Sequence, residues 1–330
     1  MILPYTLKLA AFCFAIFFLV HAVLSLAVHV FSGGAIRRAE KAGQFRGARF
    51  LLCLRLFPVC FALLSVAALC VPSYLLFEPR GYAEHLDLLC SGAAIFGLAI
   101  WSISIFRSLR SLNRSLEFAR SVKHAGVAIS VPGERLQAWV LSGGRPIFAL
   151  CGVFRPRLIF SREVQRALSA EEFHVALRHE LAHRESRDNL KRLLFLLAPE
   201  PLPFSRCFRA VERAWAKLSE GAADEYAASG DPQAPLALAH ALVRVARLGA
   251  PRVSELSASL IAEEDLAERV ERLLRMDGDA VRQLPSRTPA WRIAGIACGA
   301  LLAIAAATVV FHAWSPILYA THLLLERMIG

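Results

Sequence analysis

Four long runs without charged residues constrain this chain more than any other feature of its sequence. About 20 apolar residues in a row are enough to cross the hydrocarbon core of a bilayer as a helix. In this 330-residue sequence such runs cover about residues 9–31, 56–77, 88–106 and 293–314. The first run is longer than the apolar part of a cleavable secretory signal, and a single basic residue, Lys8, precedes it. We therefore predict four transmembrane helices.

The distribution of Lys and Arg predicts how these helices are oriented. Between the first and second runs lie Arg37, Arg38, Lys41, Arg46, Arg49 and Arg55, against a single acid, Glu40. Basic residues also follow the third run, whereas the short loop between the second and third runs has no positive excess. Because basic loops stay in the cytoplasm, both termini are expected outside it, and residues 107 to about 292 inside.

The net charge of +11 does not indicate a protein that binds nucleic acid. Much of the excess lies within a few residues of the ends of the spans, where membrane topology and anionic lipid headgroups account for it. We find no helix-turn-helix or other nucleic-acid-reading motif. The expected partner is the lipid bilayer. The eight cysteines include no Cys-x-x-Cys pair, which disfavours a thiolate zinc site or a redox motif.

The region between the third and fourth runs is expected to form a folded domain. After an amphipathic, basic segment at 108–133, β-prone stretches between Gly and Pro turns predict strands at about 137–141, 146–151 and 157–160. Ser169 and Glu172 have the spacing of a capping box, which starts a helix that runs to about Leu197. Further helices are expected at about 205–228, 235–248 and 254–276. The predicted division is 1–107 for three transmembrane helices, 108–290 for a cytoplasmic domain, and 291–330 for the fourth transmembrane helix and a short extracytoplasmic tail.

The first of these helices carries the sequence RHELAHRESRDN at residues 178–189. His179 and His183 are one helical turn apart, so both imidazoles can reach one tetrahedral zinc ion. Glu180 then lies beside the ion, where it can take a proton from water. A zinc hydrolase needs a third protein ligand and an open position.

Candidates for the third ligand lie downstream, namely Glu200, Glu212, Glu220, Asp224 and Glu225. If the helices at 170–197 and 205–228 form an antiparallel hairpin, His183 lies about 16 residues before the turn and Glu220 about 18 after it. The two residues are then at about the same distance from the turn along the hairpin, and so side by side. Asp224 is one turn further on, level with His179, where it can accept a hydrogen bond from the imidazole. Glu220 is the preferred ligand, and Asp224 is the alternative.

These residues carry a resemblance to the BlaR/MecR-type integral-membrane zinc metallopeptidases, in the run FALCGVFRPRLIFS…LSAEEFHVALRHELAHRESRDNL…SEGAADEYA. That family places a gluzincin domain in the cytoplasm between its third and fourth transmembrane helices. The resemblance is close over about residues 146–230. It implies that His179, His183 and Glu220 bind zinc, that Glu180 is the catalytic base, and that Asp224 orients a ligand. The expected fold is therefore an α-helical membrane protein with four transmembrane helices and an inserted, mainly helical α+β zincin domain.

Two departures from the family pattern bear on function. Family members that sense β-lactams carry a penicillin-binding domain after the fourth span, whereas about a dozen residues follow Pro316 here, and the sequence has no Ser-x-x-Lys motif. Direct sensing of β-lactams is therefore not expected. Ala223 stands where the sensors often have Cys, and is closer to the Glu-x-x-Ala-Asp form of HtpX and the CAAX prenyl proteases.

The predicted function is zinc-dependent hydrolysis of a polypeptide on the cytoplasmic side of a bacterial inner membrane. The resemblance implies a cytoplasmic transcriptional repressor or the enzyme's own loop as substrate, in a signal relay across the membrane. Zinc peptidases often hold substrate as an added strand. The segment 146–151 is a candidate edge, and a simple covering sheet is the equal alternative. Two other functions remain open: membrane-protein quality control in the manner of HtpX, and a non-catalytic sensor or scaffold.

Overall fold

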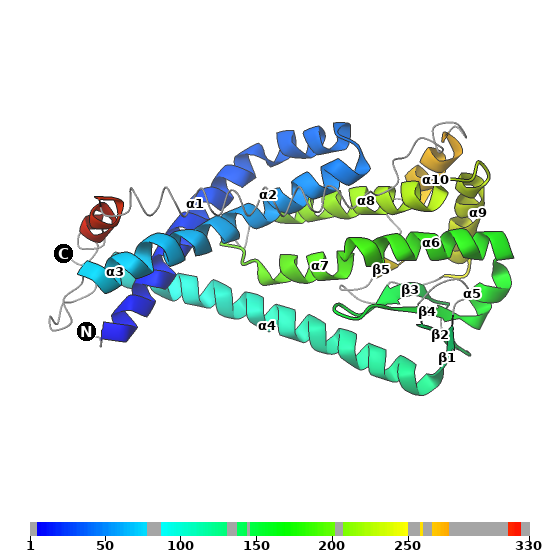
Figure 1. Cartoon of the computed structure of the whole chain (residues 1–330), viewed down its shortest axis with the longest axis horizontal. Coiled ribbons are helices and arrows are strands. Elements are labelled where there is room, and N and C mark those ends of the chain that lie inside the picture. The colour runs from blue at the N-terminus through cyan, green and yellow to red at the C-terminus, as the bar shows by residue number, and fades with distance from the viewer. Residues whose placement is uncertain are drawn as a thin grey trace.

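The computed structural model describes residues 5–77, 87–130, 137–143, 146–201, 207–249, 258–259, 266–276 and 316–324. The described chain is mostly helical and elongated, with long helices at one end and a small mixed sheet at the other (Figure 1).

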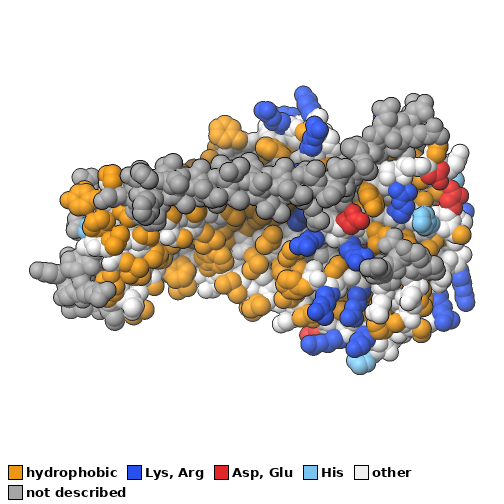
Figure 2. All heavy atoms as spheres, viewed as in Figure 1, with side chains coloured by type: hydrophobic (Ala, Val, Ile, Leu, Met, Phe, Trp, Pro, Cys, Tyr) orange, Lys and Arg blue, Asp and Glu red, His pale blue; other side chains and the backbone are white. Residues whose placement is uncertain are grey.

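Three helical segments are long and apolar enough to cross a membrane. These are α1 (Tyr5–Lys41), the continuous stretch Gln44–Phe77, and α4 (Leu88–Ala125). They contain the first three predicted spans. At 1.5 Å per residue, the 37 residues of α1 extend over about 55 Å, well beyond a hydrocarbon core of about 30 Å. Hydrophobic side chains cover much of the visible surface around these helices, whereas Lys and Arg gather towards the other half (Figure 2).

The stretch Gln44–Phe77 consists of α2 (Gln44–Ser65), a π-helical turn (Val66–Cys70) and α3 (Val71–Phe77). α1 packs against both α2 and α4. The fourth span, predicted at 293–314, lies outside the described residues. Helical residues 316–324 contact α3, where the buried hydroxyl of Ser73 donates to the carbonyl of Leu318 at 3.0 Å.

The sheet has the order β1-β2-β4-β3-β5 and is antiparallel except between β2 and β4. The predicted strands are present as β2 (Gln137–Leu141), β3 (Phe148–Cys151) and β4 (Arg157–Ser161). β1 (Gly126–Ser130) was not predicted. The segment at 108–133, expected to be amphipathic and basic, is helical as far as Ala125, and the stretch Gly126–Ser130 that follows pairs with β2.

The sheet lies between the end of α4 and the helices of the inserted region. Val122 of α4 packs on one face with Ala149 and Ile159. Phe148 and Phe160 point to the other face, into a core shared with α6 (Ala170–Ser186) and α9 (Ala234–Arg247). α5 (Arg162–Ala167) follows β4 directly. The Ser169–Glu172 capping box is present at the start of α6, so the origin of the site-bearing helix was predicted correctly.

Two predicted helices differ from those observed. The helix expected to reach Leu197 is interrupted at Arg187, whose backbone is left-handed with φ of 55°, and continues as α7 (Asp188–Leu197). Among the described residues of the helix expected at 254–276, α10 covers Leu266–Leu274. The two residues of β5 (Ala258–Ser259) pair instead with β3. β3 is buried, and its backbone N–H and C=O groups therefore require hydrogen-bond partners within the protein.

α7 and α8 (Cys207–Ala228) form a hairpin whose tip lies among the long helices. α8 runs along α2, and α7 packs against α4 (Figure 1). At the tip, Ala198 packs with Phe17 and Val59, and the buried Nε2 of His21 lies 3.0 Å from the carbonyl oxygen of Pro199. The α7–α8 hairpin and the apolar helices are therefore one packed unit.

Candidate metal centre

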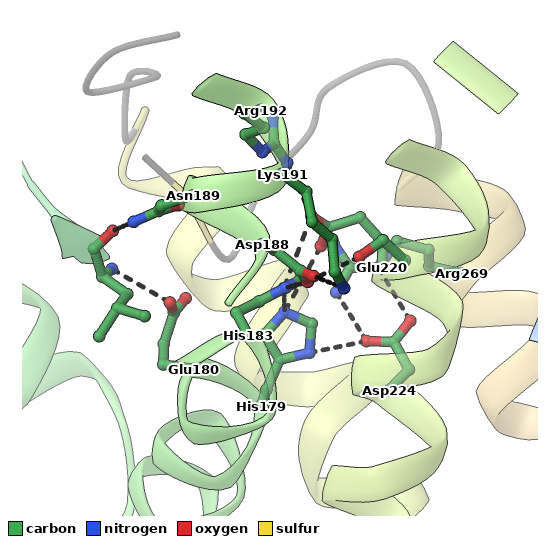
Figure 3. A network of polar contacts seen from close by, with 12 residues as sticks. His179, Glu180, His183, Asp188, Asn189, Lys191, Arg192, Glu220, Asp224 and Arg269 are labelled. Atoms are coloured by element: carbon green, nitrogen blue, oxygen red, sulfur yellow. Dashed lines mark hydrogen bonds and ion pairs between the residues drawn. The ribbon is translucent and has the colours of Figure 1, made fainter. Parts of the chain in front are cut away.

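Three side chains on two helices converge in the interior of the inserted region (Figure 3). His179 and His183 come from α6 and Glu220 comes from α8, and all three are buried. One potential ligand atom of each lies within 4.8 Å of the others, so the group could hold a metal ion. The i,i+4 spacing puts both imidazoles on the face of α6 that packs against α8.

The separations of the donor atoms fit a small tetrahedral ion. The two histidine Nε2 atoms are 3.1 Å apart. Glu220 oxygens lie 3.4 Å from Nε2 of His179 and 3.6 Å from Nε2 of His183. Ligands bound at about 2.0–2.1 Å in tetrahedral geometry are about 3.3–3.4 Å from one another. The two sets of distances agree without any rearrangement of the helices.

The far side of each imidazole contacts a carboxylate. Nδ1 of His183 lies 2.7 Å from Asp188, and Nδ1 of His179 lies 3.1 Å from Asp224. When each Nδ1 carries the proton that these acceptors require, a neutral ring presents a lone pair at Nε2. Two such lone pairs 3.1 Å apart repel each other unless a proton or a cation lies between them. The arrangement is therefore suited to a bound cation.

Asp188 reaches His183 because of the break at Arg187. Five residues along a continuous helix correspond to a rotation of about 140°, which would direct Asp188 away from His183. The left-handed Arg187 redirects the chain, and Asp188 becomes buried beside the ring. Ser219 donates to the same carboxylate at 2.7 Å, and Lys191 donates to its other oxygen at 2.7 Å.

Two arginines on α10 and one on α7 balance the acidic side of the site. Arg269 is buried and donates to both oxygens of Asp224, at 3.0 and 2.7 Å, and its Nη1 lies 3.3 Å from Glu220. Arg272 donates to Asp224 at 2.8 Å, and Arg192 lies 3.8 Å from Glu220. Burial alone would raise the pKa of Asp224, but Arg269 and the adjacent His179 lower it.

The charges of the ligand residues shift one another's pKa values in opposite directions. Burial acts to raise the pKa of Glu220, but the charge of His183 and hydrogen bonds from both histidines hold it well below its usual range. Burial acts to lower the pKa of His183, but Glu220 and Asp188 outweigh it and raise the pKa to about 10. Without metal, the site therefore favours holding protons on its histidines, and a metal ion would displace them.

Glu180 lies beside this group and faces the sheet. It is buried, and one carboxylate oxygen accepts a hydrogen bond from the backbone N–H of Leu150 at 3.1 Å. The other oxygen, Oε1, has no hydrogen-bond partner among the residues that the structure describes. Burial raises the pKa of Glu180 to about 7. A carboxylate with such a pKa can both take up and release a proton near neutral pH.

The strand next to Glu180 is not an open edge. Ala149 and Leu150 of β3 pair with Ser259 and Ala258 of β5, so of the two alternatives for 146–151 an exposed edge is excluded at these two positions. Asn189 donates from Nδ2 to the carbonyls of Leu150 and Gly152, at 3.0 and 2.9 Å. Glu180 and Asn189 thus both hold the backbone of β3 to the helices that carry the histidines.

The other acidic candidates lie elsewhere. Glu212 bonds to Arg55 at 2.7 Å, and Glu200 lies 4.0 Å from the same guanidinium, at the tip of the hairpin. The sequence analysis missed Asp188 and Arg269 as part of the site. Asp188 was not among the predicted site residues, and nothing local marks Arg269, which lies 45 residues beyond Asp224 in the sequence.

Comparison with known proteins gives no family for this chain. No protein-family model matches it, and no curated protein matches it. The resemblance to membrane metallopeptidases therefore rests on the residues and their geometry.

Proposed function

We propose that this protein is an integral-membrane, zinc-dependent endopeptidase of the BlaR/MecR type that cuts a protein substrate on the cytoplasmic side of the membrane. The observation that carries this proposal is the convergence of His179, His183 and Glu220 with Glu180 beside them. Four residues of the required types meet in one buried place, with donor separations suited to tetrahedral zinc. The three long apolar helices support a location in a membrane.

His179, His183 and Glu220 would hold the ion, and Asp224 and Asp188 would fix the orientation of the two rings. A zinc ion there would supply Lewis-acid chemistry, polarising a scissile carbonyl and making a water molecule more acidic. Glu180 would accept the proton on a carboxylate oxygen and pass it to the departing amine. The buried surroundings of Glu180 favour this exchange, because burial raises its pKa towards neutrality.

An extended substrate would lie along β3. The outer side of this strand already pairs with a short antiparallel segment of the chain, β5, directly beside Glu180. Substrate bound in the same manner would bring a peptide carbonyl to the metal centre by backbone hydrogen bonds, largely independently of side chains. β5 would have to leave this edge first.

The cellular role that we propose is regulated proteolysis in a signal relay, with a cytoplasmic transcriptional repressor as substrate and the bacterial inner membrane as location. The basic residues at the end of α1 and in the first half of α2 support a cytoplasmic active site, because Lys and Arg accumulate on that side. The tip of the α7–α8 hairpin packs among membrane helices, which gives a physical route from those helices to the metal ligands.

The decisive experiment compares wild type with Glu180→Gln at matched expression in cells. Protein N-termini are mapped by mass spectrometry, and the metal content of the purified full-length proteins is measured in detergent. We expect about one zinc per chain in both proteins, and one or two new N-termini that depend on Glu180. Glu180→Gln changes no ligand and is nearly isosteric, so it separates loss of chemistry from loss of fold.

Other outcomes would point elsewhere. Many Glu180-dependent termini from misfolded membrane proteins would indicate quality control. Zinc without any Glu180-dependent cleavage, under resting and envelope-stressed conditions, would favour a non-catalytic sensor. Absence of bound metal from freshly purified wild type, and failure to take up added zinc, would overturn the proposal.

A further inference from the structure

A cleft of about 760 Å³ adjoins the metal centre. One wall is the turn between β3 and β4, and the other is the junction of α6 and α7. His183 and Asp188 belong to its lining, as does Leu150, the β3 residue that bonds to Glu180. The cleft is therefore continuous with the place where a peptide would be cut, and is large enough for several side chains.

Arginine side chains dominate the charge of this cleft. Arg155 and Arg157 come from the β3–β4 turn, and Arg184 and Arg187 come from the end of α6. Among the described residues, none of the four forms an ion pair with a carboxylate. Figure 2 shows many Lys and Arg side chains in the half of the molecule that holds the sheet.

The one carboxylate in the described lining does not neutralise the arginines. Both oxygens of Asp188 are taken, by His183, Ser219 and Lys191. Arg155, Arg184 and Arg187 thus line the cleft without acidic partners from the described chain, whereas the guanidinium of Arg157 lies over the ring of Trp139, 5.9 Å from its centroid. Such a concentration of one sign of charge between low-dielectric walls strengthens the local field and favours an anionic occupant.

The direction of β5 on β3 indicates which part of a peptide would enter the cleft. β3 runs towards the β3–β4 turn, and β5 is antiparallel to it, with Ser259 opposite Ala149 and Ala258 opposite Leu150. Consider a peptide strand bound to β3 in the same direction as β5. Its residues before the one opposite Leu150 extend towards the arginines. Because Glu180 accepts a hydrogen bond from Leu150, the cleaved bond would lie opposite Leu150. The residues that extend towards the arginines are therefore on the amino-terminal side of that bond.

We propose that this arginine cleft selects substrates with acidic side chains shortly before the cleaved bond. The inference rests on the proposed peptidase function and names the substrate class for it. The planar guanidinium matches a carboxylate with two parallel hydrogen bonds, which gives direction as well as attraction. The two walls supply such groups from opposite sides, so that an acidic segment can be held between them.

The test measures binding rather than turnover. Full-length Glu180→Gln protein is immobilised in detergent and exposed to a randomised library of twelve-residue peptides, and the captured peptides are sequenced by mass spectrometry. We expect Asp and Glu to be enriched by roughly tenfold over the library, as two partly exposed ion pairs can provide. On the same background, Arg155→Gln/Arg187→Gln removes one exposed arginine from each wall and should abolish the enrichment.

A matched control carries Arg166→Gln/Arg247→Gln, which removes the same charge from exposed positions on α5 and α9 outside the cleft. It should keep the enrichment. Acidic peptides that are not enriched, or an enrichment that survives in the cleft variant, would overturn the inference. In a second arm, phosphatidylglycerol is added to the micelles; if the cleft variant loses stabilisation by this lipid instead of peptide selection, the cleft is a lipid site. Because no step requires hydrolysis, failure here is distinct from an absence of Glu180-dependent cleavage.

Discussion

Asp188 Oδ2 lies 2.7 Å from Nδ1 of His183, although the two residues are only five apart in the sequence. A continuous helix would separate them around its circumference. The left-handed backbone of Arg187 ends α6 at Ser186 and starts α7 with Asp188 turned towards the ring. The interruption therefore supplies a partner to a candidate metal ligand, and it also opens the junction that forms one wall of the arginine cleft.

Asp188→Asn should weaken zinc binding by about 10–100-fold, the usual effect of losing a carboxylate that orients a ligand histidine. The substitution keeps the shape but removes the negative charge opposite His183. Zinc affinity is measured by competition with a chelating dye on purified protein in detergent. Glu171→Gln, an exposed change in the first turn of α6, the helix that carries His183, is the control and should leave the affinity unchanged. Equal affinities in the two variants would remove Asp188 from the metal centre.

Arg269→Met should destabilise the metal-free protein more than the zinc-bound protein. Arg269 is buried against Asp224 and Glu220, and removing one partner of a buried ion pair costs about 3–5 kcal/mol. A bound zinc ion would supply positive charge to the same acids and reduce that loss. Thermal unfolding is followed by Trp fluorescence with and without zinc. The exposed Arg275→Met, directly after the end of α10, should cost little in either state, and an equal loss in both states for Arg269→Met would contradict the prediction.

The pair Arg55–Glu212 should bind the hairpin to the long helices. Arg55 on α2 is fully buried, bonds to Glu212 on α8 at 2.7 Å, and donates to the carbonyls of Phe195 and Ala198. We expect Arg55→Met and Glu212→Met each to lower the thermal unfolding temperature, because each leaves a buried charge without its partner. The double variant should recover part of the loss, as coupled residues do. Strictly additive losses in the thermal scan would show that the pair is not coupled.

The sequence predicted those features that depend on local periodicity. His179 and His183 share a helix face by their spacing, and counting along a hairpin brought Glu220 level with them. The three apolar runs and the strands β2, β3 and β4 follow equally from patterns within a few residues. These predictions needed no knowledge of distant contacts.

The remaining parts of the site depend on tertiary packing, which overrides local pattern. Nothing in the stretch around Arg187 distinguishes a helix break from a continuous helix, so the contact of Asp188 with His183 was not predicted. Ala258 and Ser259 were expected in a helix, but they pair with β3. Neither the sequence of β3 nor that of β5 indicates this pairing by itself. Arg269 lies on a helix with ordinary amphipathic pattern, and its burial against Asp224 follows only from how α10 docks.

Asn189 should set the position of β3 over the metal centre. Its amide donates to the carbonyls of Leu150 and Gly152, while the N–H of Leu150 bonds to Glu180, so one short stretch of strand is held from both sides. Asn189→Asp replaces the donor by a carboxylate that faces two carbonyl oxygens, whereas Asn189→Ala only removes the hydrogen bonds. We therefore expect Asp to be the more harmful substitution, by about 1–3 kcal/mol in unfolding free energy, with a larger fall in kcat/KM for peptide hydrolysis. Metal affinity should change less than activity, because both bonds from Nδ2 go to backbone carbonyls of Leu150 and Gly152. If the two variants lost stability and activity equally, or if zinc affinity fell with activity, the side chain would support the fold or the metal ligands rather than the strand.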